Sequence, residues 1–361
     1  MTTFLIPTLV MNGIAVFIYA LIVLLKTFVA SYGTCQVTVN GSKVLTIQGG
    51  TYLDKALFQN RIYLPSACGG KGTCGFCKVK VSDGIPDPLP VEEILINYKE
   101  IREGFRLSCQ TKIRSDMFIE IPEELLSIRE YRGVIQKSDY VTRDIKRISI
   151  HIEEPEDGLD FKSGQYLTFK VQEGETRAYS IASSEKRQDE VQIEVKLIPN
   201  GLGSSYLHSL TEGDELAFFG PYGQFYLRDT SHKVICVAGG VGLAPMKPII
   251  FETLLKYPDR DVELYYGVRT IEDLYDHDLF LRLQANQLRF RYWPTLEKIS
   301  EDELDPGIFT QGFVNKTLNE HMTDGEKSEA YLCGPPLMLS SAIEVLKAKG
   351  VPEIRILYDK F

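Results

Sequence analysis

The chain has 361 residues, enough for several domains, and its 44% hydrophobic and 25% charged residues are those of an ordinary globular protein. Its net charge of −9 argues against nucleic acid as a partner, because phosphate binding requires a basic face, and plain solubility accounts for most of the acidity. Seven cysteines, four of them in one cluster and three scattered, make a poor disulfide framework and favour a reducing compartment for the soluble part.

The first predicted element is a membrane anchor within residues 1–30. The run from Phe4 to Leu25 is mostly apolar, carries no charged side chain and is closed by Lys26, so it is long enough to cross the hydrocarbon as one helix. A cleaved signal peptide fits less well, because no basic region precedes the run and Phe28 stands where a small residue is needed. We therefore expect a single-pass anchor in the lipid bilayer of an inner or cytoplasmic membrane, with the following domains on the cytoplasmic side, as Lys26 favours.

Residues 33–122 are expected to form a small α+β domain of the β-grasp type. Asn40-Gly41 between two alternating runs predicts a hairpin, and Thr51 with Asp54 is a plausible capping box for the helix that follows. The predicted elements are strands 36–39, 43–47 and 77–81 and helices 51–60 and 91–103. Hairpin, helix, cysteine loop and strand follow one another in the β-grasp order.

The cysteine loop of this domain has the spacing Cys68-x5-Cys74-x2-Cys77, and Cys109 returns later. Three thiolates on one loop with a fourth from elsewhere suit a 2Fe-2S cluster bound by these four cysteines. Glycines at positions 69, 70, 72 and 75 supply the positive-φ freedom that a loop needs to surround a cofactor. Structural zinc is the alternative, but zinc ribbons usually pair two C-x2-C knuckles and this chain has one.

Residues 130–229, after a linker at 121–127, are expected to form an antiparallel β-barrel. Short strands separated by turn residues are typical of a small barrel. The predicted strands are 133–136, 145–153, 165–171, 178–182, 191–198 and 215–219, with one helix at 204–210.

Two motifs of this domain indicate a flavin. Arg177-Ala178-Tyr179-Ser180 offers an Arg to hold a phosphate, a Tyr to lie along a ring and a Ser to donate to a ring nitrogen, although a solvated strand fits as well. A glycine loop that opens a helix then provides an anion site suited to a pyrophosphate. The candidate FAD-binding residues are Arg177, Tyr179, Ser180, Gly201, Ser204 and Ser205.

Residues 232–361 are expected to form a Rossmann-like α/β domain. Strands and helices alternate here, which implies a parallel sheet with right-handed crossovers. The predicted strands are 233–238, 262–268, 330–333 and 354–358, and the predicted helices are 245–256, 316–321 and 338–349.

The run from Gly239 to Pro245 (GGVGLAP) lies between the first of these strands and its helix. A strand, a glycine loop and a helix at the carboxyl edge of a sheet form a dinucleotide site, although a tight turn also explains the glycines. Further candidate binding residues stand at the ends of later strands, at the edge where α/β sheets bind ligands. The candidate NADH-binding residues are Gly240, Gly242, Pro245, Gly267, Arg269, Glu272, Cys333, Gly334 and Pro335.

Two further features bear on the ligand. Glu272 and Asp273 would suit a free ribose hydroxyl and repel a 2′-phosphate, which favours NADH over NADPH, although a solvated helix start fits equally. The terminal Phe361 could cover a flavin face until nicotinamide displaces it, or could be an ordinary packed end.

Residues from about 131 to 361 resemble the ferredoxin–NADP+ reductase superfamily. The motifs that carry the resemblance are Arg177-x-Tyr179-Ser180, Gly201-x-x-Ser204, Gly240-x-Gly242-x-x-Pro245 and Cys333-Gly334-Pro335-Pro336. The resemblance implies that Ser180 donates toward the flavin N5 side, that Arg177 holds the pyrophosphate and that Cys333 lines the nicotinamide site. Ser180 and Cys333 are therefore the candidate catalytic residues.

The whole chain is most similar to the F-subunit family of the sodium-translocating NADH:quinone reductases. One N-terminal span precedes the 2Fe-2S, flavin and NADH motifs, and the cysteine spacing and the lead-in Ser66-Ala67-Cys68-Gly69-Gly70 are also similar. The resemblance implies an NADH dehydrogenase that passes electrons from NADH through FAD and 2Fe-2S to membrane subunits or a membrane acceptor. The alternatives are the reductase component of a multicomponent oxygenase and, outside enzymes, a docking subunit with inactive reductase motifs.

Overall fold

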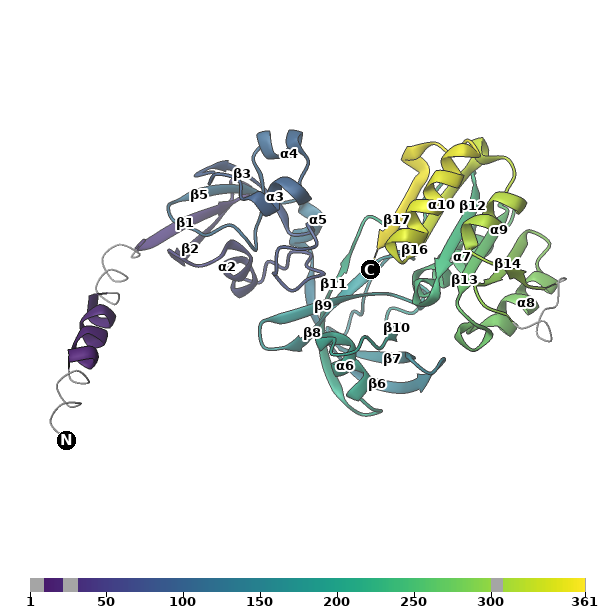
Figure 1. Cartoon of the computed structure of the whole chain (residues 1–361), viewed down its shortest axis with the longest axis horizontal. Coiled ribbons are helices and arrows are strands. Elements are labelled where there is room, and N and C mark those ends of the chain that lie inside the picture. Colours follow the sequence, from purple (N-terminus) through teal and green to yellow (C-terminus); the bar gives the residue numbers. More distant parts are fainter. Residues whose placement is uncertain (1–9, 22–31, 300–307, 361) are drawn as a thin grey trace. The chain divides into compact units, whose positions relative to one another are not determined.

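The computed structural model describes residues 10–21, 32–299 and 308–360 of the chain (Figure 1). It forms two compact units, Met1–Ser127 and Ile128–Phe361. Residues 10–21 are helical, and among the described residues no helix is long and apolar enough to cross a membrane. Both ends of the predicted anchor lie outside the described residues, so the structure describes only its central part.

The first unit contains a five-stranded sheet in the order β2-β1-β5-β3-β4 (Figure 1). β1 pairs in parallel with β5 and antiparallel with β2, and β3 pairs antiparallel with both β4 and β5. This mixed sheet with a helix packed on it confirms the β-grasp prediction. The elements are β1 Thr34–Val39, β2 Lys43–Gln48, α2 Leu53–Gln59, β3 Lys78–Asp83, α3 Pro90–Leu95, α4 Tyr98–Arg102, β4 Phe105–Leu107, β5 Met117–Glu120 and α5 Glu123–Leu126.

Two local predictions in this unit are wrong. The helix predicted over 91–103 is broken into α3 and α4, because Ile96 is extended and Asn97 caps a new helix by accepting the N–H of Glu100 at 2.8 Å. Thr51 caps nothing, since its hydroxyl donates to the carbonyl of Gln48 at 2.8 Å and α2 begins only at Leu53.

The first half of the second unit is a six-stranded antiparallel sheet in the order β10-β7-β6-β11-β8-β9. A bridge between Ile181 and Ile193 joins the two ends of that order, which closes the sheet and confirms the predicted barrel. Its interior is filled by aliphatic and aromatic side chains such as Ile148, Phe169 and Phe218. The elements are β6 Arg129–Tyr140, β7 Ile145–Glu154, β8 Tyr166–Gln172, β9 Glu175–Ser180, β10 Glu190–Lys196, α6 Leu202–Ser209 and β11 Glu215–Tyr222.

The second half of this unit is a parallel sheet of six strands in the order β15-β14-β13-β12-β16-β17 (Figure 1). Alternate residues of β12 point to opposite faces: Cys236 packs with α7 and α8, and Val237 packs with α9 and α10. Helices thus cover both faces, as a Rossmann-like domain requires. The elements are β12 Lys233–Gly239, α7 Leu243–Lys256, β13 Val262–Val268, α8 His277–Asn286, β14 Phe290–Leu296, β15 Thr310–Gln311, α9 Val314–His321, β16 Ser328–Gly334, α10 Pro336–Ala348 and β17 Ile356–Lys360.

Neither α8 nor β14 was predicted from the sequence. β14 contains Pro294, which argues against an internal strand because it lacks an N–H. In the described part of the sheet, β15 pairs only with Thr295 and Leu296, so Pro294 stands just before the stretch that has partners on both sides.

Candidate functional site

The four cysteines predicted to bind the cluster form two sulfur pairs. Cys68 Sγ lies 3.4 Å from Cys74 Sγ, and Cys77 Sγ lies 3.3 Å from Cys109 Sγ. Cys77 comes from the end of the loop just before β3, and Cys109 follows β4, which pairs with β3. The β3–β4 ladder therefore brings the distant fourth cysteine to the loop.

This arrangement fits a two-iron cluster better than a single metal ion. A 2Fe-2S centre takes two thiolates at each of two irons, whereas a structural zinc needs four ligands around one point. In the described part of the chain, no three His, Cys, Asp or Glu side chains surround one such point. Two separate pairs are therefore the donor set that the cluster requires, and the residues fit it.

Within each pair the two sulfurs are hydrogen-bonded, and this contact changes the pKa of both. The partner's thiol donates to Cys68 and to Cys109, which lowers the pKa of both, and the same contacts raise the pKa of Cys74 and Cys77. One sulfur of each pair is thus already favoured as the thiolate, the form that binds iron.

The glycine prediction for this loop is confirmed. Gly69, Gly70, Gly72 and Gly75 have φ values of 64°, 80°, 71° and 75°, a region that side-chain-bearing residues rarely adopt. The loop can therefore bend around a cofactor between its cysteines.

Two acidic residues near the loop were not predicted from the sequence. Glu92, only 2% exposed, accepts the N–H of Leu89 at 2.8 Å and that of Leu107 at 2.7 Å, and so fixes the backbone just before Cys109. Burial raises the pKa of Asp54, whose Oδ2 would lie 3.1 Å from a Cβ on Gly70. Glu92 has a weak sequence signal, because it stands three residues after Leu89 at a helix start, where capping boxes place Glu. Asp54 was predicted only as a capping-box partner of Thr51, and nothing in the sequence indicates its place beside Gly70.

The flavin motifs meet on the surface of the barrel. A Cβ on Gly203 would lie 2.6 Å from Arg177 Cγ and 2.7 Å from Tyr179 Oη, so the glycine loop and the start of α6 lie directly against β9. Every residue of β9 is half-buried, whereas four of the seven residues of β10 are fully buried. β9 therefore has neither a fully exposed face nor a fully buried face, as expected for a strand that a flat ligand covers.

The polar groups of this surface are only partly available to bind a ligand, because some already bond to the protein. Arg177 Nη1 donates to Glu175 Oε2 at 2.9 Å and to the Thr176 carbonyl at 2.6 Å, which leaves the other terminal nitrogen of the guanidinium for a phosphate. Ser204, predicted to contact the pyrophosphate, is 5% exposed, and its hydroxyl bonds the backbone of Ile198 and Gly201. The Ser204 hydroxyl therefore stabilises the backbone of the glycine loop itself.

The dinucleotide motifs meet at the carboxyl edge of the parallel sheet. Gly239 at the end of β12 is level with Gly267 on β13, and Ala238 is level with Cys333 on β16. The glycine loop then turns into α7, with Gly240 at φ 54°. Three motifs that are far apart in the sequence thus share one edge, where parallel sheets bind nucleotides.

The other predicted residues of this edge differ in exposure. Cys333 is 2% exposed, and burial raises the pKa of its thiol well above the usual value, so it stays protonated and neutral. Arg269, Glu272 and Pro335 are exposed beside the glycine loop or after β13. Phe361 lies outside the described residues.

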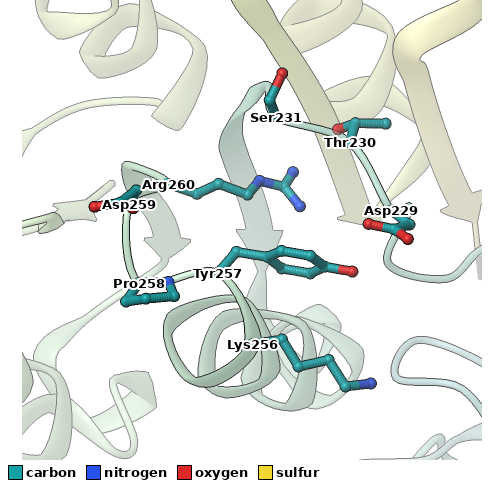
Figure 2. Close-up of a pocket in the computed structure, with 8 residues that line it drawn as sticks. All are labelled: Asp229, Thr230, Ser231, Lys256, Tyr257, Pro258, Asp259 and Arg260. Carbon is teal, nitrogen blue, oxygen red and sulfur yellow. The ribbon is translucent and has the colours of Figure 1, made fainter.

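A separate pocket of about 530 Å³ lies at the opposite edge of the same sheet (Figure 2). It is formed where the chain enters β12 and where α7 connects to β13. Arg260, inside it, already donates to Glu329 Oε1 at 2.7 Å and to the His232 carbonyl at 2.8 Å. Within its sheet, this pocket lies at the edge opposite the glycine loop and Cys333. Its lining residues are Asp229, Thr230, Ser231, Lys256, Tyr257, Pro258, Asp259 and Arg260.

Three family profiles match the chain. Residues 37–114 match a 2Fe-2S iron-sulfur cluster binding domain, residues 132–226 an oxidoreductase FAD-binding domain and residues 236–343 an oxidoreductase NAD-binding domain. The three profiles follow the order of the cysteine pairs, the β9–α6 surface and the carboxyl edge of the parallel sheet.

Curated proteins resemble the chain over its full length. The F subunit of the Na(+)-translocating NADH-quinone reductase of Neisseria meningitidis is 33% identical over 401 residues, covering 98% of each chain. The protein of the same name in Pseudomonas aeruginosa is 29% identical and covers 97% of this chain and 96% of its own.

Among solved structures, an Amycolatopsis cytochrome P450 reductase has a TM-score of 0.73 at 28% identity, covering 91% of this chain and 99% of its own. The ferredoxin reductase of carbazole 1,9a-dioxygenase has a TM-score of 0.69 at 24% identity, covering 91% and 98%, and shows the same fold.

Proposed function

Because the chain belongs to the F-subunit family of the Na(+)-translocating NADH-quinone reductases, we propose that it is the NADH-oxidising subunit of such a complex. The observation that carries the proposal is 33% identity to an F subunit over 98% of both chains. The chain is an oxidoreductase with 2Fe-2S, FAD and NAD domains. The membrane acceptor, a quinone-reductase complex around it and the coupling to sodium ions come from the relatives' name and are part of the proposal.

When bound, the two groups would supply complementary chemistry: FAD the two-electron hydride chemistry with NADH, and the 2Fe-2S centre one-electron transfer. The chain's own residues bind and orient these groups. Arg177 and the Gly201 loop would hold the FAD pyrophosphate. Tyr179 would pack along the flavin, and Ser180 at the end of β9 would donate toward its N5 side. Ser205, in the first turn of α6, adds a further donor near the phosphates.

The dinucleotide lies at the carboxyl edge of the parallel sheet. Gly240 and Gly242 bring backbone N–H groups of the α7 start to its pyrophosphate. Pro335 and the neutral Cys333 thiol line the nicotinamide end, and Arg269 and Glu272 lie at the adenosine end. A neutral thiol adds no charge beside a ring whose charge changes on oxidation.

We assign residues 33–122, 130–229 and 232–361 to the three cofactor domains and residues 1–30 to a single-pass anchor. The described helix at 10–21 supports the anchor, since Met11, Phe17 and Tyr19 are 73%, 68% and 70% exposed with no protein surface covering them. An anchor whose following domains face the cytoplasm gives the 2Fe-2S centre access to a membrane partner.

The proposal is tested with the full chain in detergent, loaded with both cofactors and mixed anaerobically with NADH. We expect the flavin band to bleach and the cluster to become paramagnetic, and a soluble quinone to reverse both changes. A flavin band that persists with excess NADH would remove the enzymatic function and leave the docking subunit.

The likeness to the cytochrome P450 reductase favours one second candidate, the reductase component of an oxygenase. The two functions differ in the partner that receives the electrons. An F subunit should co-purify from solubilised membranes with integral membrane proteins, whereas an oxygenase reductase should support turnover of a soluble oxygenase added to it.

A further inference from the structure

A buried group of four charged side chains and one tyrosine connects the flavin barrel to the dinucleotide half of the second unit. The barrel contributes Arg147 from β7 and Glu194 from β10. The other half contributes Lys247 from α7 and the pair Tyr275 and Asp276, which precede α8. We call these five residues the ion cluster.

The contacts in the ion cluster are short and shielded from water. Lys247 Nζ lies 2.7 Å from Glu194 Oε1 and 2.9 Å from Asp276 Oδ2. Arg147 Nη2 contacts the same two carboxylates at 2.7 and 2.5 Å. The side chains of Glu194, Lys247 and Asp276 are 0%, 9% and 14% exposed. Two cations and two carboxylates cancel in charge, so each buried group is paired, the condition for tolerating buried charge.

The ion cluster holds the end of one particular loop. Residues 269–276 connect β13 to α8, and we call them the β13–α8 loop. Tyr275 Oη donates to Glu194 Oε2 at 2.6 Å. Asp276 is in the left-handed conformation, with φ 56°, which is uncommon for a residue with a side chain. The loop therefore ends in an unfavourable backbone conformation at the residue whose carboxylate the cluster holds.

A second barrel arginine faces the middle of the same loop. Arg143, four residues before Arg147, places Nη2 at 4.0 Å from Asp273 Oδ1. Glu272 and Asp273 are the acidic residues proposed to face the NADH ribose. The loop begins where β13 ends, at the nucleotide edge of the sheet, yet its side-chain partners come from the flavin barrel.

We infer that the flavin barrel positions the loop that binds the adenosine end of NADH, with Arg147, Lys247, Tyr275 and Asp276 as positioning residues. The inference rests on the proposed dinucleotide site at this edge. None of the four is proposed to contact NADH. They fix the β13–α8 loop in its binding conformation before the ligand arrives, so that binding does not have to order it.

The direct test is Asp276→Gly, because glycine adopts positive φ freely and the substitution removes only the carboxylate. In the full chain with both cofactors, we expect the KM for NADH and the competitive inhibition constant of ADP-ribose to rise about tenfold together. Flavin content and kcat at saturating NADH should change less than about twofold, since the hydride-transfer end is untouched. ADP-ribose lacks nicotinamide and reports only on the adenosine end.

Tyr275→Phe is a milder second variant that removes a single hydroxyl. It should also raise the KM for NADH and the inhibition constant of ADP-ribose, but by a smaller factor than Asp276→Gly. The matched control is Lys256→Gln. Lys256, at the other end of α7, contacts Glu185 of the barrel at 2.5 Å, so it also joins the two halves but does not touch the loop. In Lys256→Gln, the KM for NADH and the inhibition constant of ADP-ribose should stay at the wild-type values.

Unchanged constants in Asp276→Gly and Tyr275→Phe with native flavin content would overturn the inference. Equal rises in Lys256→Gln would also overturn it, because general docking of the two halves would then set affinity. If ADP-ribose fails to compete with NADH in the wild type, the proposed site itself is wrong and the inference falls with it.

Discussion

A Cβ placed on Gly242 would lie 2.1 Å from the carbonyl oxygen of Cys333. The backbone of Gly242 is ordinary, with φ −62°, so its conformation does not require glycine. The requirement comes from backbone packing: the loop between β12 and α7 lies directly on the end of β16. The glycine loop and the Cys333 strand are therefore one structural unit at the nucleotide edge.

Gly242→Ala should displace this loop, because the carbonyl of a sheet strand cannot move aside as a flexible side chain can. We expect a loss of about 1–3 kcal/mol in the free energy of unfolding, typical of overpacking, and a higher KM for NADH. Thermal unfolding and steady-state kinetics measure the two effects. Gly213→Ala, before β11 of the barrel, is the control, since a Cβ there meets nothing within 4 Å and only its φ of 89° is strained. An equal rise in KM for Gly213→Ala would contradict the steric account.

Glu92→Ala should weaken the support that the backbone at Leu107 gives to Cys109. It leaves the N–H groups of Leu89 and Leu107 without their acceptor. Leu107 is fully buried, and an unpaired buried N–H costs about 1–3 kcal/mol. We expect a lower unfolding temperature of the 2Fe-2S unit and faster bleaching of the cluster by an iron chelator. The adjacent Glu93 is exposed, so Glu93→Ala should change neither. Equal chelator rates for the two variants would show that Glu92 does not support Cys109.

His277 should make stability fall on mild acidification. Burial lowers its pKa below the usual 6.5, and Asp278 opposes this weakly. Its Nδ1 lies 3.2 Å from the Tyr292 hydroxyl. The unfolded chain therefore binds the proton more readily, and stability is lost as pH falls below about 6.5.

The measurement is chemical unfolding of the wild type and of His277→Gln at pH 7.5 and 5.5. The variant should lose less stability between the two than the wild type does. Identical losses would mean that other groups produce the acid sensitivity.

Glu272→Gln combined with Asp273→Asn should relax the preference for NADH. The two carboxylates disfavour a 2′-phosphate by repulsion, so removing them should lower the ratio of kcat/KM for NADH over NADPH by about tenfold. Glu297→Gln is a control with one charge fewer in the same half of the unit. A ratio that does not change in the double variant would remove these acids from coenzyme choice.

Local signals in the sequence predicted local structure well. Asn40 and Gly41 both have positive φ, 50° and 67°, as a tight hairpin turn demands, and the two residues alone carry that information. The glycines of the cysteine loop behave in the same way. The strand endings that carry Gly242, Gly267 and Cys333 could also be assigned, because parallel strands share one carboxyl edge.

Features that depend on contacts between elements could not be predicted. Glu194 lies on a strand between buried residues, and only the packing of the other half of the unit against it gives its charge partners. β5, whose central position joins β1 to β3, has no strong local signal. The internal role of Ser204 is likewise invisible in the sequence, since a serine at a helix start suits either a ligand or the backbone.

The most direct test of the account is an anaerobic NADH titration of the full chain and of Cys74→Ser, with flavin absorbance and the paramagnetic signal of the cluster recorded together. Cys35→Ser, which changes a buried cysteine outside the two sulfur pairs, is the control and should behave as the wild type. We predict that NADH bleaches the flavin in all three proteins and that only Cys74→Ser lacks the cluster signal. Loss of NADH-dependent flavin bleaching in Cys74→Ser, with its flavin still bound, would contradict electron flow from NADH through the flavin to the cluster.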